Sequence, residues 1–148
     1  MLVNIKPSEQ TALLGVIAPI SQGVGTVTSG WCTMQTFDKI LAVISTGVLG
    51  AAGTVDAKIQ QAQDSSGTGV KDVAGKAITQ LVVASNNNNQ ALINVNAQDL
   101  DVTNSFDYVR LSLTVGGAAS LVAGALLGFS ARFDPASDSN PATVVQVV

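Results

Sequence analysis

The chain has 148 residues, enough for one domain with a buried core. Hydrophobic residues make up 47% of it, whereas charged residues make up only 11%, well below the roughly 25% typical of soluble domains. The net charge of −3 provides no basic field for a phosphate backbone, so we expect no direct nucleic-acid binding. A surface with so few charges is poorly protected against self-association, which suits a chain that lives in an assembly.

Residues 1–30 are predicted to form an extended N-terminal arm. Gly15 and Pro19 interrupt the apolar run from residue 13 to 20, and residues 21–30 carry no charge, which disfavours a helix. Two placements fit this pattern equally well: the arm lies on a neighbouring molecule, or it pairs as an edge strand of its own domain. Residues 1–7 lack the basic region and apolar run of a secretory signal, so we expect synthesis and retention in the host cytoplasm.

Regular strands are expected from residue 31 onward. The clearest is the segment 54–61, where Val55, Ala57 and Ile59 alternate with polar residues in the period of two that marks a half-buried strand. Residues 64–69 and 85–89 have the composition of polar turns. Further strands are predicted within Thr36–Thr46, Lys71–Ala84 and Gln90–Ala97, the second of these in preference to a short helix.

The stretch Asp99–Phe133 is predicted to contain two strands joined by a turn, and we expect them to form the central hairpin of a sandwich. Gly116 and Gly117 can adopt positive φ without steric cost, so the chain can reverse there. In the first strand one face carries Asp107, Val109, Leu111, Leu113 and Val115; in the second, one face carries Leu121, Ala123, Ala125, Leu127 and Phe129, opposite Gly124, Gly128 and Ser130.

A membrane helix is the rival interpretation of part of this stretch. Residues 111–131 contain no charge, and they match the length of about 20 residues that a membrane helix needs. Serine, threonine and paired glycines interrupt the segment, however, and no cluster of Lys or Arg lies beside it to set a topology. The pattern therefore favours buried strands, and we expect no membrane partner.

The end of the chain is predicted to be a loop followed by a short β-prone tail. Pro135 and Pro141 bound the loop, and the tail covers Thr143–Val148. Many short strands separated by turns predict an all-β fold, an antiparallel β-sandwich of jelly-roll type. The expected organisation is an extended arm over residues 1–30 and a sandwich with its short C-terminal tail over residues 31–148.

Catalytic and metal chemistry finds little support in the residue types. The chain has no histidine, which removes Ser-His-Asp, Cys-His and histidine-metal sites, and Cys32 is the only cysteine and is best explained as a small core residue. Asp99 and Asp101 form the nearest carboxylate pair, but turn-like residues follow them. The same residues with Asn104, and a second group at Asp134, Asp138 and Asn140, match no EF-hand spacing. We therefore expect a non-enzymatic chain without a metal or other cofactor.

Two aromatic residues leave one alternative of another class open. Trp31 and Tyr108 could stack on a sugar, which would make the chain a carbohydrate-binding module. A sandwich commonly buries a large aromatic side chain between its sheets, and a sugar platform would be more persuasive with several exposed aromatics. A structural use of both residues is therefore the simpler interpretation.

Four stretches resemble small virion proteins of tailed bacteriophages and prophages: residues 40–47, 54–62, 75–81 and 108–112, within a resemblance that covers about residues 35–135. What the resemblance implies is a decoration or cement protein with a jelly-roll body on the outer surface of the phage capsid. Its partners would be the major capsid protein and other copies of itself, with three-fold clustering as one arrangement. A vertex, collar or tail component is the alternative, and copy number would separate the two.

The apolar termini are the segments that we predict to make these contacts. A chain with few charges can stabilise a shell by adding strands and burying area across subunit seams. The candidate contact residues are Leu2, Val3, Ile5, Leu13, Leu14, Val16, Ile17, Val144, Val145 and Val147.

Overall fold

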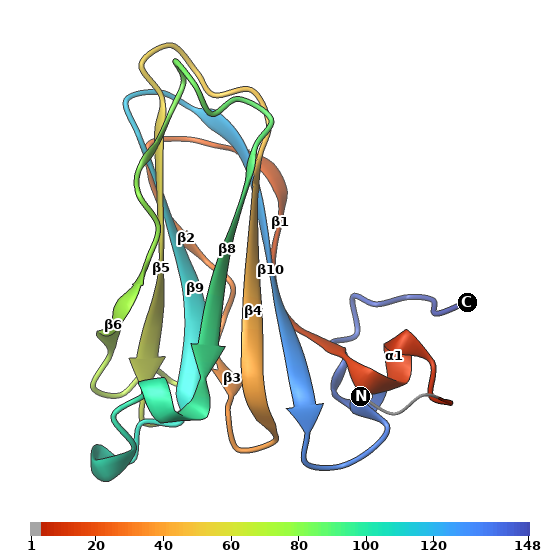
Figure 1. Cartoon of the computed structure of the whole chain (residues 1–148). Helices are drawn as coiled ribbons and strands as arrows, with labels where there is room; N and C mark the ends of the chain where they lie inside the picture. Colours follow the sequence, from red (N-terminus) through yellow and green to blue (C-terminus); the bar gives the residue numbers. More distant parts are fainter. Residues whose placement is uncertain (1–3) are drawn as a thin grey trace.

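Two β-sheets packed face to face make up the body of the protein, as Figure 1 shows for a computed structural model that describes residues 4–148. The four-stranded sheet contains β1 (Ala12–Gln22), β10 (Ser120–Ala131), β4 (Phe37–Thr46) and β8 (Gln90–Asn96), in that order. The six-stranded sheet runs through β2 (Gly25–Thr28), β9 (Tyr108–Gly116), β5 (Thr54–Ala62) and β6 (Lys71–Ala77), with β3 (Cys32–Thr33) beside β9 and β7 (Leu81–Val82) beside β5. Four short helical segments complete the fold: α1 (Pro7–Gln10), η1 (Ala97–Asp99), η2 (Val102–Asn104) and η3 (Ala136–Ser139).

The strand order is that of a jelly roll, which confirms the predicted fold class. Counting only the eight longer strands, one sheet has the order first, eighth, third and sixth, and the other the order second, seventh, fourth and fifth. Every pairing is antiparallel. The two interlocked Greek keys of a jelly roll produce this arrangement.

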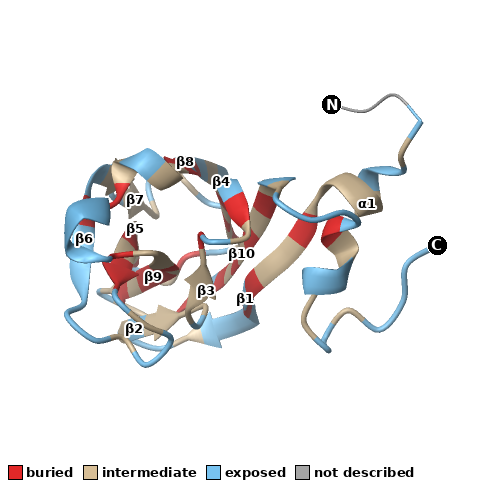
Figure 2. Ribbon diagram, turned by 90° about the horizontal axis from the view of Figure 1, so that it is seen from below, coloured by how far each residue is buried: buried red, intermediate tan, exposed pale blue. Residues whose placement is uncertain are grey.

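The core lies between the sheets and follows the period of two predicted for the strands (Figure 2). On β5, Val55, Ala57 and Ile59 are at most 2% exposed, and β9 contributes a matching row of buried residues, Val109, Leu111, Leu113 and Val115. Strands were expected within 36–46, 71–84 and 90–97, and all three segments form them. The inward set of β5 was thus predicted correctly from alternation.

The expected central hairpin is wrong, because β9 and β10 belong to different sheets. The connection between them crosses from one layer to the other. Gly117 has a φ of 72°, and a Cβ there would lie 1.9 Å from the Ala52 carbonyl oxygen, so the crossing needs glycine. A glycine turn signals that the chain reverses, but it does not say whether the returning strand pairs with its predecessor or faces it across the core.

Strand β10 turns two glycines toward the core alongside Val122 and Leu126. Gly124 and Gly128 are buried, and a Cβ on Gly124 would approach Leu111 Cδ2 to 2.7 Å. The glycines therefore let the two sheets approach closely at this strand. Leu121, Ala123, Ala125, Leu127 and Phe129 share a face as predicted, and that face is the outer one.

The N-terminal arm is not separate from the sandwich over residues 12–28. Strand β1 pairs with β10 at the edge of one sheet, and β2 pairs with β9 in the other, so the edge-strand alternative is the correct one for this segment. Register shifts in β1 between residues 13 and 15 and between 17 and 20 accommodate Gly15 and Pro19, the residues that interrupt the apolar run. The predicted boundary at residue 30 between an arm and the sandwich is therefore corrected, because backbone pairing joins residues 12–28 to the sandwich.

The membrane-helix interpretation of residues 111–131 is also wrong, because that stretch forms parts of β9 and β10. Across residues 4–148, none of the helices has the length and apolar character needed to cross a bilayer. The same sequence was ambiguous because two consecutive buried strands contain as few charges as a membrane span.

The chain ends come together outside the sandwich, next to β1 and β10, in what we call the terminal foot: residues 4–11 and 132–141 (Figure 1). Asn140 Oδ1 accepts a hydrogen bond from the backbone N–H of Leu13 at 2.8 Å, which ties η3 to the edge strand. A small second core of Ala12, Phe37 and Ala136 supports this attachment. The foot is thus anchored to the sandwich, while residues 142–148 continue beyond it.

Candidate assembly surface

The outer face of the four-stranded sheet is almost free of charge, and we call it the apolar face. Strand register places Leu13, Leu127 and Leu41 in one row across the sheet, and Val16, Ala125, Val43 and Leu92 in the next. Lys39 is the one charged residue of this face. Its members are Leu13, Val16, Lys39, Leu41, Val43, Ser45, Gln90, Leu92, Asn94, Asn96, Leu121, Ala123, Ala125, Leu127 and Phe129.

Several of these side chains are well exposed. Leu92 is 59% exposed, Leu121 46% and Val16 38%, and the remaining leucines and valines are half-buried, as neighbours on a sheet shield one another. At one end of this face, α1 and η3 contact β10. A contiguous exposed apolar surface of this kind marks an interaction site more often than scattered single residues do.

A shallow hollow lies on the apolar face between β4, β8 and β10. Its volume is about 330 Å³, and Leu41, Asn94, Asn96 and Phe129 contribute to its lining. Lys39 lies at the same end. The hollow gives this otherwise flat face a place where a side chain of another molecule could insert.

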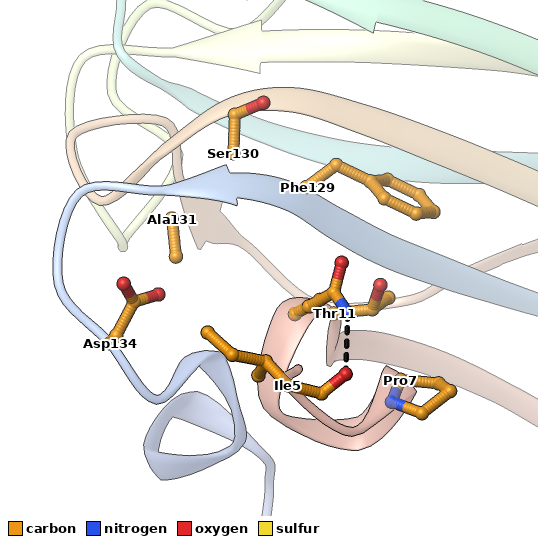
Figure 3. Close-up of a pocket in the computed structure, with 8 residues that line it drawn as sticks. Ile5, Pro7, Thr11, Phe129, Ser130, Ala131 and Asp134 are labelled. Carbon is orange, nitrogen blue, oxygen red and sulfur yellow. Dashed lines mark hydrogen bonds between the residues drawn. The ribbon is translucent and has the colours of Figure 1, made fainter. Parts of the chain in front are cut away.

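A larger pocket of about 490 Å³ opens where the terminal foot meets the end of β10 (Figure 3). Ile5 and Pro7 line it from the N-terminal segment, and Phe129 and Ala131 line it from β10, with Asp134 at one side. The turn of α1 is closed by the backbone N–H of Thr11, which donates to the Pro7 carbonyl oxygen at 3.1 Å. Because Phe129 belongs to both, the pocket adjoins the apolar face.

The C-terminal tail, residues 142–148, forms no strand. Val144 donates its backbone N–H to the Pro141 carbonyl oxygen at 2.9 Å, and beyond that bond the tail extends away from the body (Figure 1). Val145 is 92% exposed and Val147 55%. An apolar, β-prone segment without a partner strand is available for contact with another molecule.

The predicted contact residues fall into three groups. Ile5 lines the pocket, Leu13 and Val16 lie on the apolar face, and the valines of the tail, Val144, Val145 and Val147, lie beyond the foot. Ile17 was a wrong choice, because it is 3% exposed and packs in the core, and Leu14 packs against both cores. Leu2 and Val3 lie outside the described residues.

Sequence reasoning missed most of the apolar face. The contributions of β4, β8 and β10 were not among the predicted contacts, although a signal was present. In β10 and β4 both alternating sets are largely apolar, whereas a strand with one solvated face usually has one polar set. Two apolar sets on a strand of a two-layer fold indicate that its outer side meets something other than water.

The outer face of the six-stranded sheet is polar by contrast. It carries Asp56, Lys58 and Gln60 on β5 and Arg110 and Thr114 on β9, the β5 residues as predicted. Lys58 Nζ lies 2.8 Å from Asp72 Oδ2. Arg110 stacks over the Trp31 ring at 4.4 Å, so one face of that ring holds a guanidinium rather than open space for a sugar.

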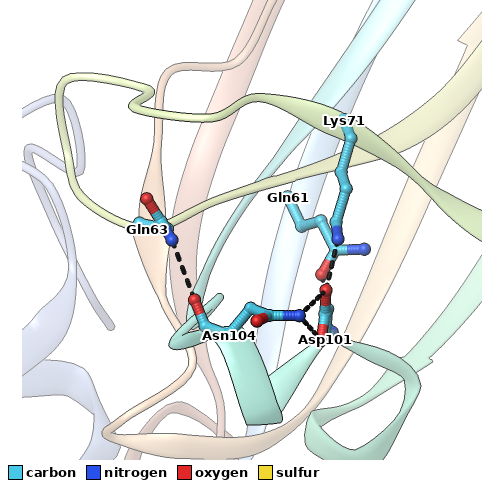
Figure 4. Close-up of polar contacts among 5 residues, drawn as sticks. All are labelled: Gln61, Gln63, Lys71, Asp101 and Asn104. Carbon is cyan, nitrogen blue, oxygen red and sulfur yellow. Dashed lines mark hydrogen bonds and ion pairs between the residues drawn. The ribbon is translucent and has the colours of Figure 1, made fainter.

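Asp99 and Asp101, the carboxylate pair considered for catalysis, each have a lysine partner instead. Asp101 pairs with Lys71 and accepts a hydrogen bond from Asn104 Nδ2, as Figure 4 shows, and the Lys71 hydrogen bond is the main cause that lowers the pKa of Asp101. Asp99 lies 2.9 Å from Lys76 Nζ. Within residues 4–148, no three carboxylate, cysteine or histidine side chains are grouped to hold a metal ion. These acids pair with lysines and cap turns.

Cys32 packs against the core, as predicted. Its Sγ donates to the Val109 carbonyl oxygen at 3.3 Å. Burial raises the pKa of the Cys32 thiol to about 12, so the thiolate that reacts with electrophiles is scarce at neutral pH.

Comparison with known proteins shows no matching family model and no matching curated protein. Among solved structures, a chain from broad bean stain virus aligns over 88% of this chain and 90% of its own length, with a TM-score of 0.48 and 8% identity. A chain from the cowpea mosaic virus empty particle aligns over 88% and 85%, with a TM-score of 0.41 and 11% identity.

The infectious bursal disease virus VP2 subviral particle is a third structure with a similar arrangement of strands. It aligns over 85% of this chain with a TM-score of 0.45 and 15% identity, and this chain spans about a third of its length (33%). Such distant similarities concern the arrangement of strands, so function has to be argued from the surface of this protein.

Proposed function

We propose that this chain is a non-enzymatic structural protein of a virus particle, and specifically a decoration or cement protein on the outer surface of a tailed-phage capsid. The observation that carries the proposal is the apolar surface that the chain ends of this jelly roll present, in the pocket beside the foot and on the unpaired tail. Jelly rolls serve repeatedly as building blocks of viral shells, which makes this use of the fold familiar.

The terminal foot and tail are the parts that would contact the major capsid protein. Helix α1 and the C-terminal tail lie on the same side of the molecule, so one surface could engage both at once (Figure 2). Val145 and Val147 expose apolar side chains that water solvates poorly, and an extended segment can add to the edge of a neighbouring sheet. Repetition around a shell would turn modest contacts of this kind into high avidity.

The decisive experiment counts copies of this chain in purified particles by quantitative mass spectrometry, against the major capsid protein. A ratio near one to one, or a simple fraction such as one to three, supports a shell-covering role. A handful of copies per particle would move the protein to a vertex, collar or tail. Absence from particles would overturn the proposal. The sugar-binding alternative would then be tested by comparing wild type and Trp31→Ala on a glycan array.

Substitution in the tail tests how the chain attaches. Val145→Asp should reduce the copies bound to particles that lack the chain by about tenfold or more, because a carboxylate in place of a valine that the contact buries costs more than about 1.4 kcal/mol. The readout is co-sedimentation of purified protein with the particles. Val24→Asp is the matched control, since Val24 is 68% exposed in the loop between β1 and β2, away from the foot.

Removal of the N-terminal twenty residues would be a poor test of attachment. Such a deletion takes away most of β1, including the buried Ala12 and Ile17, and so damages the sandwich itself.

Equal binding of wild type and Val145→Asp would exclude the tail as the point of attachment. The copy count would still decide whether the chain is a particle protein.

A further inference from the structure

The apolar face requires a partner of matching chemistry. A partner with charged residues would bury them opposite leucine, valine and alanine, where nothing pairs with them. The surface known to match in composition and extent is the same face of another copy. We propose that two copies of this chain pack their apolar faces together and form a two-fold symmetric dimer, which does not depend on the particle role proposed above.

The face is large enough for such an interface. Four strands about 4.8 Å apart, over about eight residues at about 3.4 Å each, cover about 500 Å². Two such faces would bury about 1,000 Å² in total, which is at the lower bound for a specific interface. Two sheets in face-to-face contact are also the packing that the protein already uses inside its own sandwich.

The distribution of large and small residues along the face makes it self-complementary. A two-fold axis that runs across the strands at the row of Ala125 and Val43 would oppose positions equally far above and below that row. Leu127 would then face Ala123 of the second copy, because these two residues lie two positions on either side of Ala125. In the same way Leu41 would face Ser45, so a large residue meets a small one along both central strands.

The hollow on the face fits the same arrangement. Phe129 lines the hollow, and Leu121 lies as far from Ala125 on the other side. The axis therefore brings the exposed Leu121 of one copy toward the hollow of the other. Because the axis is two-fold, the Leu121 side chain of each copy faces the hollow of the other, and the dimer is closed.

The test uses the purified full chain without particles. Sedimentation velocity over a range of concentrations should show a dimer, and Leu127→Lys should weaken dimerisation at least tenfold, because it places a charge against the second copy. Thr114→Lys is the matched control. Thr114 faces outward on β9, a central strand of the six-stranded sheet, so the same substitution there should leave the dimer intact.

Cross-linking locates the axis independently of stability. An Ala125→Cys variant should be joined across the dimer by a bismaleimide that spans two sheets about 10 Å apart, and Cys32 should react little because its pKa of about 12 leaves almost no thiolate. Asp56→Cys, on the polar face, should give no such product.

Three outcomes would overturn the dimer. These are a chain that stays monomeric at every concentration, an oligomer (a trimer included) that Leu127→Lys leaves unchanged, and a monomer that uses this face to bind particles. At a concentration low enough for both proteins to be monomeric, circular dichroism of Leu127→Lys should show a melting temperature close to that of wild type, since this residue lies outside the core. None of these outcomes bears on the copy count in particles, so failure of the dimer and failure of the particle role are separable.

Discussion

The two outer faces of this jelly roll differ sharply although the same chain builds both. The six-stranded sheet presents acids, lysines, an arginine and amides, three of whose lysines pair with aspartates. The four-stranded sheet presents leucine, valine and alanine with Lys39 as its one charge. Both sheets have equally buried inner faces, so the difference does not serve the core.

The two faces also differ in what can cover them favourably. Water solvates the polar face, and ion pairs there contribute little because they are exposed. The apolar face gains nothing from water and gains free energy when another apolar surface covers it. The contrast between the two faces, rather than any single residue, therefore indicates which side of the protein another molecule would cover.

The largest expected effect separates the two sides of β10 itself. Leu126→Ala should destabilise the fold by about 2–5 kcal/mol, because Leu126 is fully buried and its removal leaves a cavity. Leu127→Ala, one residue along on the apolar face, should cost less than about 1 kcal/mol in dilute, monomeric protein. Urea unfolding of both variants checks this, and similar losses of stability would contradict the assignment of the two faces.

Acid should affect the polar sheet and spare the apolar face. The pKa of Asp72 is lowered mainly by its hydrogen bond with Lys58, and that of Asp99 by the backbone N–H of Asn96 and then by Lys76. These carboxylates stabilise the fold above their unfolded pKa of 3.8, and that contribution disappears as pH falls through their lower folded values. The chain has no histidine, so we expect unfolding free energy to be flat from about pH 5 to 8 and to fall below about pH 4.

Urea titrations at several pH values measure this dependence. Asp99→Asn should lose stability at pH 7 and show a shallower fall below pH 4 than wild type. Asp38→Asn, at an exposed position of β4, is the control and should follow the wild-type curve. Dimerisation measured from pH 5 to 8 should stay constant, and a pH-dependent dimer would show that charged groups take part in it.

Alternation predicted most of the fold from the sequence. Val55, Ala57 and Ile59 were assigned to the core from their period of two, and the structure buries all three. The same rule could not place β9 and β10 in different sheets, because the period of a strand is identical whether its successor pairs beside it or faces it. Only the close approach of Gly117 to Ala52 reveals the crossing, and that contact is long-range.

The candidate site was predicted less completely, for a related physical reason. Leu13 and Val16 were chosen because they are apolar and near the N-terminus, but Ile17 has the same chemistry and lies in the core. Which of them points outward depends on the register shifts in β1, and those depend on the strand it pairs with. Local composition identifies an apolar edge strand, while the partner strand decides which side chains remain available.

The smallest expected effect tests the polar side of the comparison. Lys58 and Asp72 form an ion pair at 2.8 Å, but their side chains are 41% and 54% exposed, so the pair should contribute no more than about 1 kcal/mol. Lys58→Met should therefore change the urea midpoint slightly at low salt and hardly at all at 1 M salt, where screening has already weakened the pair. Leu127→Lys on the other face should disrupt the dimer at both salt concentrations, because salt does not restore the burial that the charge prevents. If 1 M salt restored the dimer of Leu127→Lys, charge rather than apolar burial would hold the two copies together. The two faces would then differ in composition but not in the kind of interaction they make.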